Sequence, residues 1–433
     1  MTNVSLPLLA FALSLLQALT PFTARAQKKG ADTVAGFPVN YDEALVETYT
    51  LPDPLLLPGG KKVTDARTWN TVRRPELVKL FEEQQFGKMP PRPADLRFRV
   101  FDTGTPAFGG KALRKQVTVY FTQDTTQHKM DLLLYLPATA KKPSPVLLLL
   151  NFSANSTSVE DPGVKAGEVW TREGKKIPAA ASRSFGKMNV DTFLANGIGV
   201  AMVYYGDIEP DFKDGYRYGI RGHYLKPGQE RPGPDEWGAI SAWAWGLSRA
   251  MDYLETDRQV DAGRVALQGT SRLGKTVLWA GAHDPRFKLV IASCSGEGGA
   301  ALSRRNYGES INHMTDTSRY YYQFAPNRHQ YASHPQLAPV DAHMLVALMA
   351  PRPLLLQTGD TDYWSDPKGE LLAAAAAEPV YRLFGKKGPG TTEMPPAGAT
   401  TLFNTLGYYL HAGGHGTIPS DWPVFLSYLK KHL

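Results

Sequence analysis

The chain has 433 residues, of which 42% are hydrophobic and 21% are charged, a composition typical of a globular protein with a large core. It excludes a disordered or collagen-like chain, and the single cysteine, Cys294, excludes an internal disulfide. A count of 48 Lys and Arg against 41 Asp and Glu gives a net charge of +7. Basic runs interleaved with aromatic residues are lacking, so we expect no nucleic-acid partner, and nothing in the sequence indicates an oligomeric state.

The first 26 residues have the features of a signal peptide. Residues 6–22 are apolar and uncharged, and the small-x-small pattern of residues 24–26 follows them. A membrane anchor is the alternative, but Pro7 and the short apolar run argue against it, because a stable crossing needs about 20 apolar residues. We therefore expect cleavage after Ala26, a secreted or periplasmic protein, and no membrane association after cleavage.

The rest of the chain divides into a segment of weak periodicity and a longer region of alternating elements. Residues 27–110 are rich in proline and glycine, with one helical face at residues 75–86, and we expect them to form an N-terminal wrap packed on the core. In residues 111–433, strand-like runs alternate with helix-length segments such as residues 235–255 and 422–433. This alternation predicts an α/β fold, a three-layer αβα sandwich around a mostly parallel sheet. The expected strands are residues 114–121, 128–136, 146–150, 199–205, 264–268, 288–293, 353–358 and 406–411.

Residues 265–281 have the pattern of a strand, a turn bracketed by glycines and a helix, and two functions fit this pattern. Residues 269–276 match the P-loop, whose backbone N–H groups bind phosphates, but a secreted protein meets little nucleotide. The other function is a nucleophile elbow, in which Ser271 projects its hydroxyl from a sharp turn at the carboxyl edge of the sheet. We favour the elbow, although its second glycine, Gly274, lies one residue later than in the G-x-S-x-G form.

Partners for the serine follow in the order acid then histidine, as in an α/β-hydrolase. His415 lies in a glycine-rich loop just beyond the last expected strand, whereas His411, at the end of that strand, fits a packing role. Asp362 follows the strand at 353–358, where an acid can orient the imidazole and stabilise its charged form. Asp360 and Asp366 are close competitors for this role.

Several motifs accompany these residues. They are Gly-x-Ser-Arg-x-Gly-Lys at 269–275, Ser-Gly-x-Gly-Gly at 295–299, Asp-Ala-His at 341–343, Ala-Pro-Arg-Pro at 350–353, the segment 359–367 and a Gly-His-Gly near the end. Together they resemble the glucuronoyl esterases of carbohydrate esterase family 15, especially the bacterial members, from roughly residue 114 to the C-terminus. The resemblance implies an α/β-hydrolase without a metal or other cofactor. It also implies hydrolysis, through an acyl-enzyme, of the ester between glucuronate or 4-O-methyl-glucuronate on xylan and a lignin alcohol.

The resemblance extends to individual residues of the catalytic machinery. It makes Ser271 the nucleophile, His415 the base and Arg272 the group that stabilises the oxyanion, through its backbone N–H and its guanidinium. The sequence departs from the family at the acid, because many members carry a glutamate 23 residues after the serine, where this chain has Cys294. A buried thiol, with a reference pKa of about 8.5, cannot replace a carboxylate at neutral pH.

Two carboxylates can fill the missing role. Asp362 is the first, on the strength of its place after a strand, and Glu297 is the alternative acid, three residues beyond the cysteine. We favour Asp362, because a triad needs a firmly placed acid and the glycines that flank Glu297 offer little support.

Substrate contacts are implied by the resemblance as well. Lys275 and Glu309 would bind sugar hydroxyls, and Trp364 would pack against the sugar ring. The plain alternatives are a solvated lysine, an exposed carboxylate and a core tryptophan. Residues 299–336 are rich in Tyr, Arg and His, which suits either a loop that faces a sugar or aromatic packing.

Two other functions use the same residues. An acetyl-xylan esterase or general carboxylesterase would have the same triad without a pocket for a uronate. The non-enzyme alternative is a catalytically inactive carbohydrate-binding protein of the same fold, but a serine, an acid and a histidine are all retained in this sequence.

Overall fold

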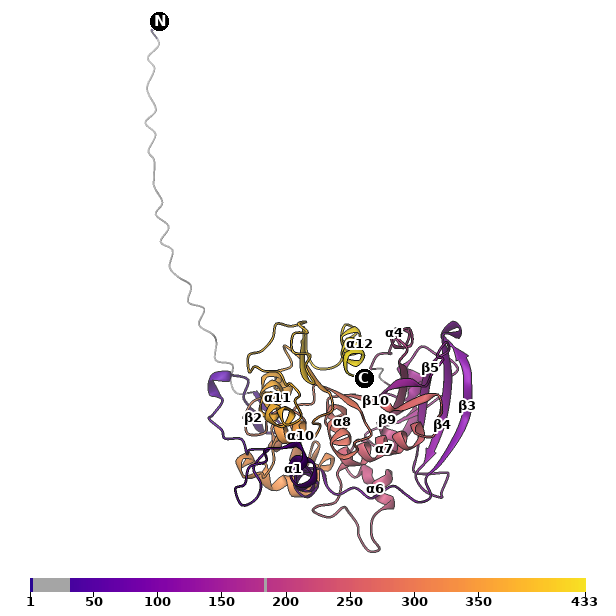
Figure 1. Ribbon diagram of the computed structural model, residues 1–433, viewed down its shortest axis with the longest axis horizontal. Coiled ribbons are helices and arrows are strands. Elements are labelled where there is room, and N and C mark those ends of the chain that lie inside the picture. Colours follow the sequence, from indigo (N-terminus) through magenta and orange to yellow (C-terminus); the bar gives the residue numbers. More distant parts are fainter. Residues whose placement is uncertain (3–31, 183–184) are drawn as a thin grey trace.

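The computed structural model describes residues 1–2, 32–182 and 185–433, and a nine-stranded sheet runs through these residues (Figure 1). The strand order is β13-β12-β11-β10-β6-β9-β5-β4-β3. The six strands from β13 to β9 are mutually parallel, and β5, β4 and β3 continue the sheet in antiparallel pairs. The bounds are β3 (Arg97–Ala107), β4 (Ala112–Tyr120), β5 (Lys129–Pro137), β6 (Ser144–Asn151), β9 (Gly199–Tyr204), β10 (Val260–Thr270), β11 (Leu289–Ser293), β12 (Leu354–Gly359) and β13 (Leu406–His411).

Helices cover both faces of the sheet, which confirms the predicted α/β fold. The strand interiors are continuous apolar runs, because alternate residues enter two different cores. Leu148 of β6 joins the core under α7, α8 and α11, whereas Leu147 and Leu149 join the core under α4 and α12. Figure 1 shows α4 and α12 above the sheet and α7 and α8 below it. The helix bounds are α1 (Ala66–Thr68), α2 (Arg74–Phe81), α3 (Asn155–Ser158), α4 (Asp191–Leu194), α5 (Tyr205–Ile208), α6 (Ile220–His223), α7 (Ala239–Leu254), α8 (Arg272–His283), α9 (Ile311–Thr315), α10 (Ala342–Ala347), α11 (Pro367–Arg382) and α12 (Asp421–His432).

The N-terminal segment packs against α8 through aromatic rings. The helix expected at residues 75–86 is α-helical only to Phe81, and a π-helical turn at Glu82–Phe86 continues it. Because a π-helical turn brings residues i and i+5 together, Phe81 and Phe86 both reach Trp279 of α8, with ring centroids 6.3 Å and 4.6 Å away.

The sheet begins earlier in the chain than the sequence pattern predicts. Strand β3 at Arg97–Ala107 pairs with β4 at the far edge, so the boundary at residue 110 separates an edge strand from its own sheet. Two register shifts along β3, between Val100 and Asp102 and between Thr103 and Thr105, interrupt the alternation by which a strand is recognised. Two short hairpins lie outside the sheet, β1 (Asp32–Val34) with β2 (Phe37–Val39) and β7 (Glu168–Trp170) with β8 (Lys176–Pro178).

Nearly all of the predicted signal peptide lies outside the described residues, so it stays a prediction. None of the helices in the described ranges combines the length and the apolar sequence needed to span a bilayer.

Candidate active site

Ser271 is the single residue between β10 and α8, and its backbone is turned sharply, with φ 60° and ψ −129°. Residues other than glycine rarely adopt a positive φ, and those that do cluster at active sites. A β-carbon at Gly269 would overlap the carbonyl of Leu273, and one at Gly274 would lie 2.7 Å from the carbonyl oxygen of Ser293. The later position of the second glycine therefore reflects the close approach of α8 to β11, and the geometry is that of a nucleophile elbow.

His415 and Asp362 form the hydrogen bond expected of a catalytic pair. Nδ1 of His415 lies 2.8 Å from Oδ2 of Asp362 and 3.1 Å from the hydroxyl of Ser365. Because a carboxylate only accepts, Nδ1 carries a proton and Nε2 is left to act as a base. The Asp362 carboxylate is 2% exposed and the imidazole is 43% exposed, and Ser271 and His415 line the same pocket. The structure therefore brings the predicted serine, histidine and acid together.

The alternative acid, Glu297, is bound elsewhere. Its carboxylate is buried, forms an ion pair with Arg328 and accepts a hydrogen bond from the Ser303 hydroxyl at 3.0 Å. Burial raises the pKa of Glu297, and the adjacent Arg328 opposes this shift. Although glycines flank it, Glu297 is held firmly by Arg328 and Ser303, and it forms no hydrogen bond with His415 among the described residues.

The two aspartates that compete with Asp362 also have other partners. Asp360 accepts a hydrogen bond from the backbone N–H of Gly413 at 2.8 Å and so holds the histidine loop. Asp366 forms an ion pair with Arg305 at 3.0 Å and caps the N-terminus of α11. Neither carboxylate shares the Nδ1 hydrogen bond of His415.

Cys294 lies beside the catalytic pair. Its sulfur, a carboxylate oxygen of Asp362 and a ring nitrogen of His415 all lie within 4.8 Å of one another. The N–H of Gly416 approaches the sulfur at 3.3 Å, and burial raises the pKa of the thiol well above its ordinary value. Cysteine, aspartate and histidine are ligand types of a zinc site, but zinc binds a thiolate and burial favours the neutral thiol here. The direct hydrogen bond between the acid and the imidazole fits a pair that transfers a proton. Cys294 therefore supports the histidine loop from the place where a glutamate was expected.

His411, the other histidine of this region, has a packing role. The side chain is almost fully buried, with Nδ1 2.9 Å from an oxygen of Asp421 and Nε2 2.9 Å from the Gly414 carbonyl. It ties the loop that carries His415 to the start of α12.

Arg272 directly follows the serine as the first residue of α8 and lines the same pocket. The guanidinium carbon lies 4.8 Å from the centre of the Tyr320 ring and 5.8 Å from that of Phe152. Burial alone lowers the pKa of Arg272, but an ion pair with Asp211 raises it above its ordinary value, so the side chain stays charged. The backbone N–H of Arg272 is at the first turn of α8, where N–H groups have no partner within the helix.

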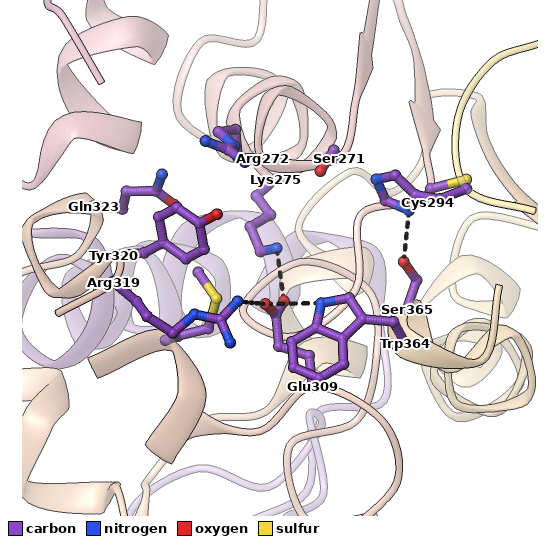
Figure 2. Close-up of a pocket in the computed structure, with 12 residues that line it drawn as sticks. Ser271, Arg272, Lys275, Cys294, Glu309, Arg319, Tyr320, Gln323, Trp364 and Ser365 are labelled. Carbon is purple, nitrogen blue, oxygen red and sulfur yellow. Dashed lines mark hydrogen bonds and ion pairs between the residues drawn. The ribbon is translucent and has the colours of Figure 1, made fainter. Parts of the chain in front are cut away.

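A small polar pocket of about 150 Å³ opens at Ser271 (Figure 2). Glu309 is at its centre, where it accepts from the Trp364 indole N–H at 3.1 Å and pairs with Lys275 Nζ at 3.4 Å. The structure therefore brings the three predicted substrate contacts together. The segment rich in Tyr, Arg and His also lines the pocket, through Arg319, Tyr320 and Gln323, to which no sequence motif assigns a role.

A larger cleft of about 1220 Å³ also opens at Ser271 and His415, and it shares Arg272, Arg319 and Tyr320 with the small pocket. Its walls combine aromatic rings with exposed cationic side chains. The aromatic residues of this wall include Phe152, Trp170, Phe185, Tyr204, Tyr205, Phe212, Tyr320, Tyr322 and Trp422. Ser271 thus lines both a small polar pocket and a wide aromatic cleft.

The fold and the serine, histidine and aspartate define a serine hydrolase of the α/β-hydrolase class. A family model described as glucuronyl esterase, fungi, matches residues 230–385. A carbohydrate esterase designated MZ0003, from an unknown prokaryotic organism, is 44% identical over 402 residues, which cover 91% of this chain and 92% of that protein. A 4-O-methyl-glucuronoyl methylesterase from Phanerochaete carnosa is 27% identical over a region that covers 88% of this chain and 82% of that protein.

The solved structure of a glucuronoyl esterase from Solibacter usitatus is 49% identical, with a TM-score of 0.84, over 89% of this chain and 99% of that one. The chain belongs to the glucuronoyl esterases of carbohydrate esterase family 15, and it is a carboxylic ester hydrolase.

Glu370 of α11 is a buried carboxyl close behind the catalytic pair. One of its oxygens accepts from the Ser295 hydroxyl at 2.9 Å and from the Gly296 N–H at 2.7 Å. The other oxygen has no hydrogen-bond partner within the described residues. Burial, with the charges of Asp362 and Asp366, raises the pKa of Glu370 to about 8, so the site holds it as the neutral acid at pH 7.

Replacement of this acid by an uncharged amide changes how stability depends on pH. A folded-state pKa above the ordinary value of 4.5 makes the wild type lose stability as pH rises from 4.5 to about 8. We expect Glu370→Gln to avoid this loss. The free energy of unfolding of the variant minus that of the wild type should therefore increase with pH, by up to about 1.4 kcal/mol per pH unit in that range. Urea unfolding at several pH values measures the difference, and a difference independent of pH would contradict the assignment.

Proposed function

We propose that this esterase hydrolyses the ester that joins the carboxyl of glucuronate or 4-O-methyl-glucuronate on xylan to a lignin alcohol. The observation that carries this proposal is that Ser271 lines both a small polar pocket and an adjoining aromatic cleft. An ester at Ser271 would place its acyl half in one and its alcohol half in the other. The names of the relatives, which include a 4-O-methyl-glucuronoyl methylesterase, support a glucuronate ester as the substrate.

The acyl side of the proposal rests on the groups around Glu309. A carboxylate accepts hydrogen bonds from sugar hydroxyls, and the Trp364 indole N–H and Lys275 hold this one in place. Lys275 adds donors for hydroxyl oxygens, and the face of Trp364 suits the C–H surface of a pyranose ring. An acetyl group offers none of these partners, so the pocket favours a uronate over the acetate of an acetyl-xylan esterase.

The alcohol side of the proposal rests on the aromatic wall. Aromatic rings stack on the phenyl groups of lignin alcohols, and cationic side chains bind aromatic faces as well. Trp170 is one such ring, fixed by its indole N–H, which donates to the Gly206 carbonyl at 3.0 Å. We infer that the cleft binds the aromatic part of the leaving alcohol.

The chemistry is a two-step acyl transfer. His415 Nε2 takes the proton of the Ser271 hydroxyl, and the oxygen attacks the ester carbonyl. The resulting oxyanion is stabilised by the N–H and the guanidinium of Arg272, and Asp362 stabilises the charged imidazole. The alcohol leaves with the proton from His415, and a water molecule, deprotonated in turn, releases the uronic acid and restores the serine. The sequence prediction that no cofactor takes part stays a prediction.

Removal of the nucleophile should abolish the reaction. Ser271→Ala is expected to fold like the wild type and to lose turnover of methyl and benzyl glucuronate esters, because no other group can form the acyl-enzyme. Initial rates on these esters, with acetylated xylan as a comparison substrate, measure the effect. Retained turnover in the variant would exclude Ser271, and faster release of acetate than of alcohol would favour an acetyl-xylan esterase.

The assignment of the acid can be tested with two matched amide substitutions. We expect Asp362→Asn to lower kcat by about 10³- to 10⁴-fold, because an amide that donates to Nδ1 favours the tautomer with the proton on Nε2, which cannot act as the base. Glu297→Gln, a change of the same kind in a carboxylate bound to Arg328, should keep kcat within about threefold and lower only the melting temperature. The reverse pattern would assign the acid to Glu297.

The role of the aromatic cleft predicts a change in substrate preference. Trp170→Ala is expected to lower kcat/KM for benzyl glucuronate by about tenfold, which corresponds to a lost stacking contact of about 1.4 kcal/mol. The methyl ester, which has no ring, is the internal control and should be unaffected. Equal losses on the two esters would show that Trp170 supports the fold rather than the alcohol.

A further inference from the structure

Asp211, on the loop after α5, binds the guanidinium of Arg272, the residue that follows the serine. Its Oδ2 forms an ion pair with Nη1 of Arg272, although 61 residues separate the two in the chain. Its Oδ1 accepts from the Tyr322 hydroxyl at 2.9 Å and from the Gln323 amide at 2.8 Å. The Asp211 side chain is 5% exposed, so the carboxylate is buried among donors on both of its oxygens.

The two contacts on Oδ1 determine what Oδ2 can do. Tyr322 and Gln323 belong to a turn of 3₁₀-helix at Tyr321–Gln323, and both hold the same oxygen. The carboxylate can therefore neither rotate nor withdraw without losing two hydrogen bonds, and its second oxygen stays directed at the arginine. A carboxylate held in this way is a fixed reference point for a flexible side chain.

Arg272 needs such a reference point. An arginine side chain has several rotatable bonds, and this one is 27% exposed at the edge of the open cleft. Tyr320 and Phe152 lie near the guanidinium, but stacking on rings allows it to slide within its own plane. A donor stabilises an oxyanion only when it lies about 2.7–3.1 Å from the place where the charge develops. Asp211 supplies the in-plane contact that the rings do not.

The pairing also leaves donors free for the reaction. Asp211 engages Nη1, and within the described residues no hydrogen bond engages Nε or Nη2 of Arg272. A guanidinium carries five N–H donors in a rigid fork, so a bond on one side fixes the direction of the others. The remaining N–H groups are therefore held in place before substrate arrives.

We propose that Asp211 is a positioning residue for catalysis, which aims the guanidinium of Arg272 at the oxyanion. This inference rests on the proposed role of Arg272, and it adds a residue that no sequence motif contains. Asp211 lies in the wall of the larger cleft but is only 5% exposed, and in this proposal it acts through the arginine.

A double-mutant cycle tests the proposal, with Asp211→Asn, Arg272→Met and the two combined. Loss of one oxyanion donor costs about 10²- to 10³-fold in kcat, and we expect Asp211→Asn to cost about 10- to 10²-fold because the guanidinium is misplaced rather than lost. In the Arg272→Met background, Asp211→Asn should change kcat by less than about threefold, because there is no guanidinium left to aim. A merely structural carboxylate would cost the same in both backgrounds.

The control is another buried carboxylate bound to an arginine. Asp102 contacts Arg114 Nε at 2.7 Å and lies on β3, at the opposite edge of the sheet from β12 and β13, which precede Asp362 and His415. Asp102→Asn should lower the melting temperature without a change in kcat, which separates loss of stability from loss of catalysis. Asp211→Ser, which leaves a hydroxyl for Tyr322 and Gln323, replaces Asp211→Asn in the cycle if the amide variant does not fold.

Two outcomes would overturn the proposal. One is a kcat of the Asp211 variant within about threefold of the wild type, and the other is an undiminished loss in the Arg272→Met background. The cycle can be run on any ester that the wild type hydrolyses and Ser271→Ala does not. A failure of the glucuronate assignment would therefore appear in the wild-type substrate comparison and not in the cycle.

Discussion

The backbone N–H of Ser271 donates to the Ser293 carbonyl at 2.8 Å, and this contact ties the nucleophile to the end of β11. It requires α8 to lie so close to the sheet that position 274 admits no side chain. The strained φ of Ser271 persists because β10, β11 and α8 all constrain the same turn. The place of the hydroxyl, and with it the place of the pocket and the cleft, follows from this turn.

The charges of the site are arranged around that hydroxyl in matched pairs. Arg272 faces Asp211, Lys275 faces Glu309, and His415 faces Asp362. An ester substrate is neutral, whereas the tetrahedral intermediate and the uronate product are anionic. Pairing keeps the cations of Arg272 and Lys275 and the imidazole of His415 in fixed positions, so the site is organised for the intermediate before it forms. Two of these carboxylates are held by further donors, Asp211 by Tyr322 and Gln323 and Glu309 by the Trp364 indole.

The parallel part of the fold and the heart of the site could be predicted from the sequence because their signals are local. Continuous apolar runs show strands that are buried on both faces, and a glycine-bracketed serine between a strand and a helix shows an elbow. Strand β3 has no such signal, since two register shifts and an edge position give it a mixed sequence. Asp211 has none either, because only the fold brings it to Arg272 across 61 residues of chain.

The order of serine, aspartate and histidine, each after a strand, together with the family motifs, predicted the hydrolase class and its candidate reacting groups. Which carboxylate bonds to His415 was a different matter, because Asp360, Asp362, Asp366 and Glu297 all lie near in sequence to the strands concerned. The tertiary structure gives each a separate partner, and only Asp362 reaches the imidazole. Chain order determines which residues reach the same edge of the sheet. Hydrogen bonds are directional over about 3 Å, and partners at that range are decided only when the loops pack.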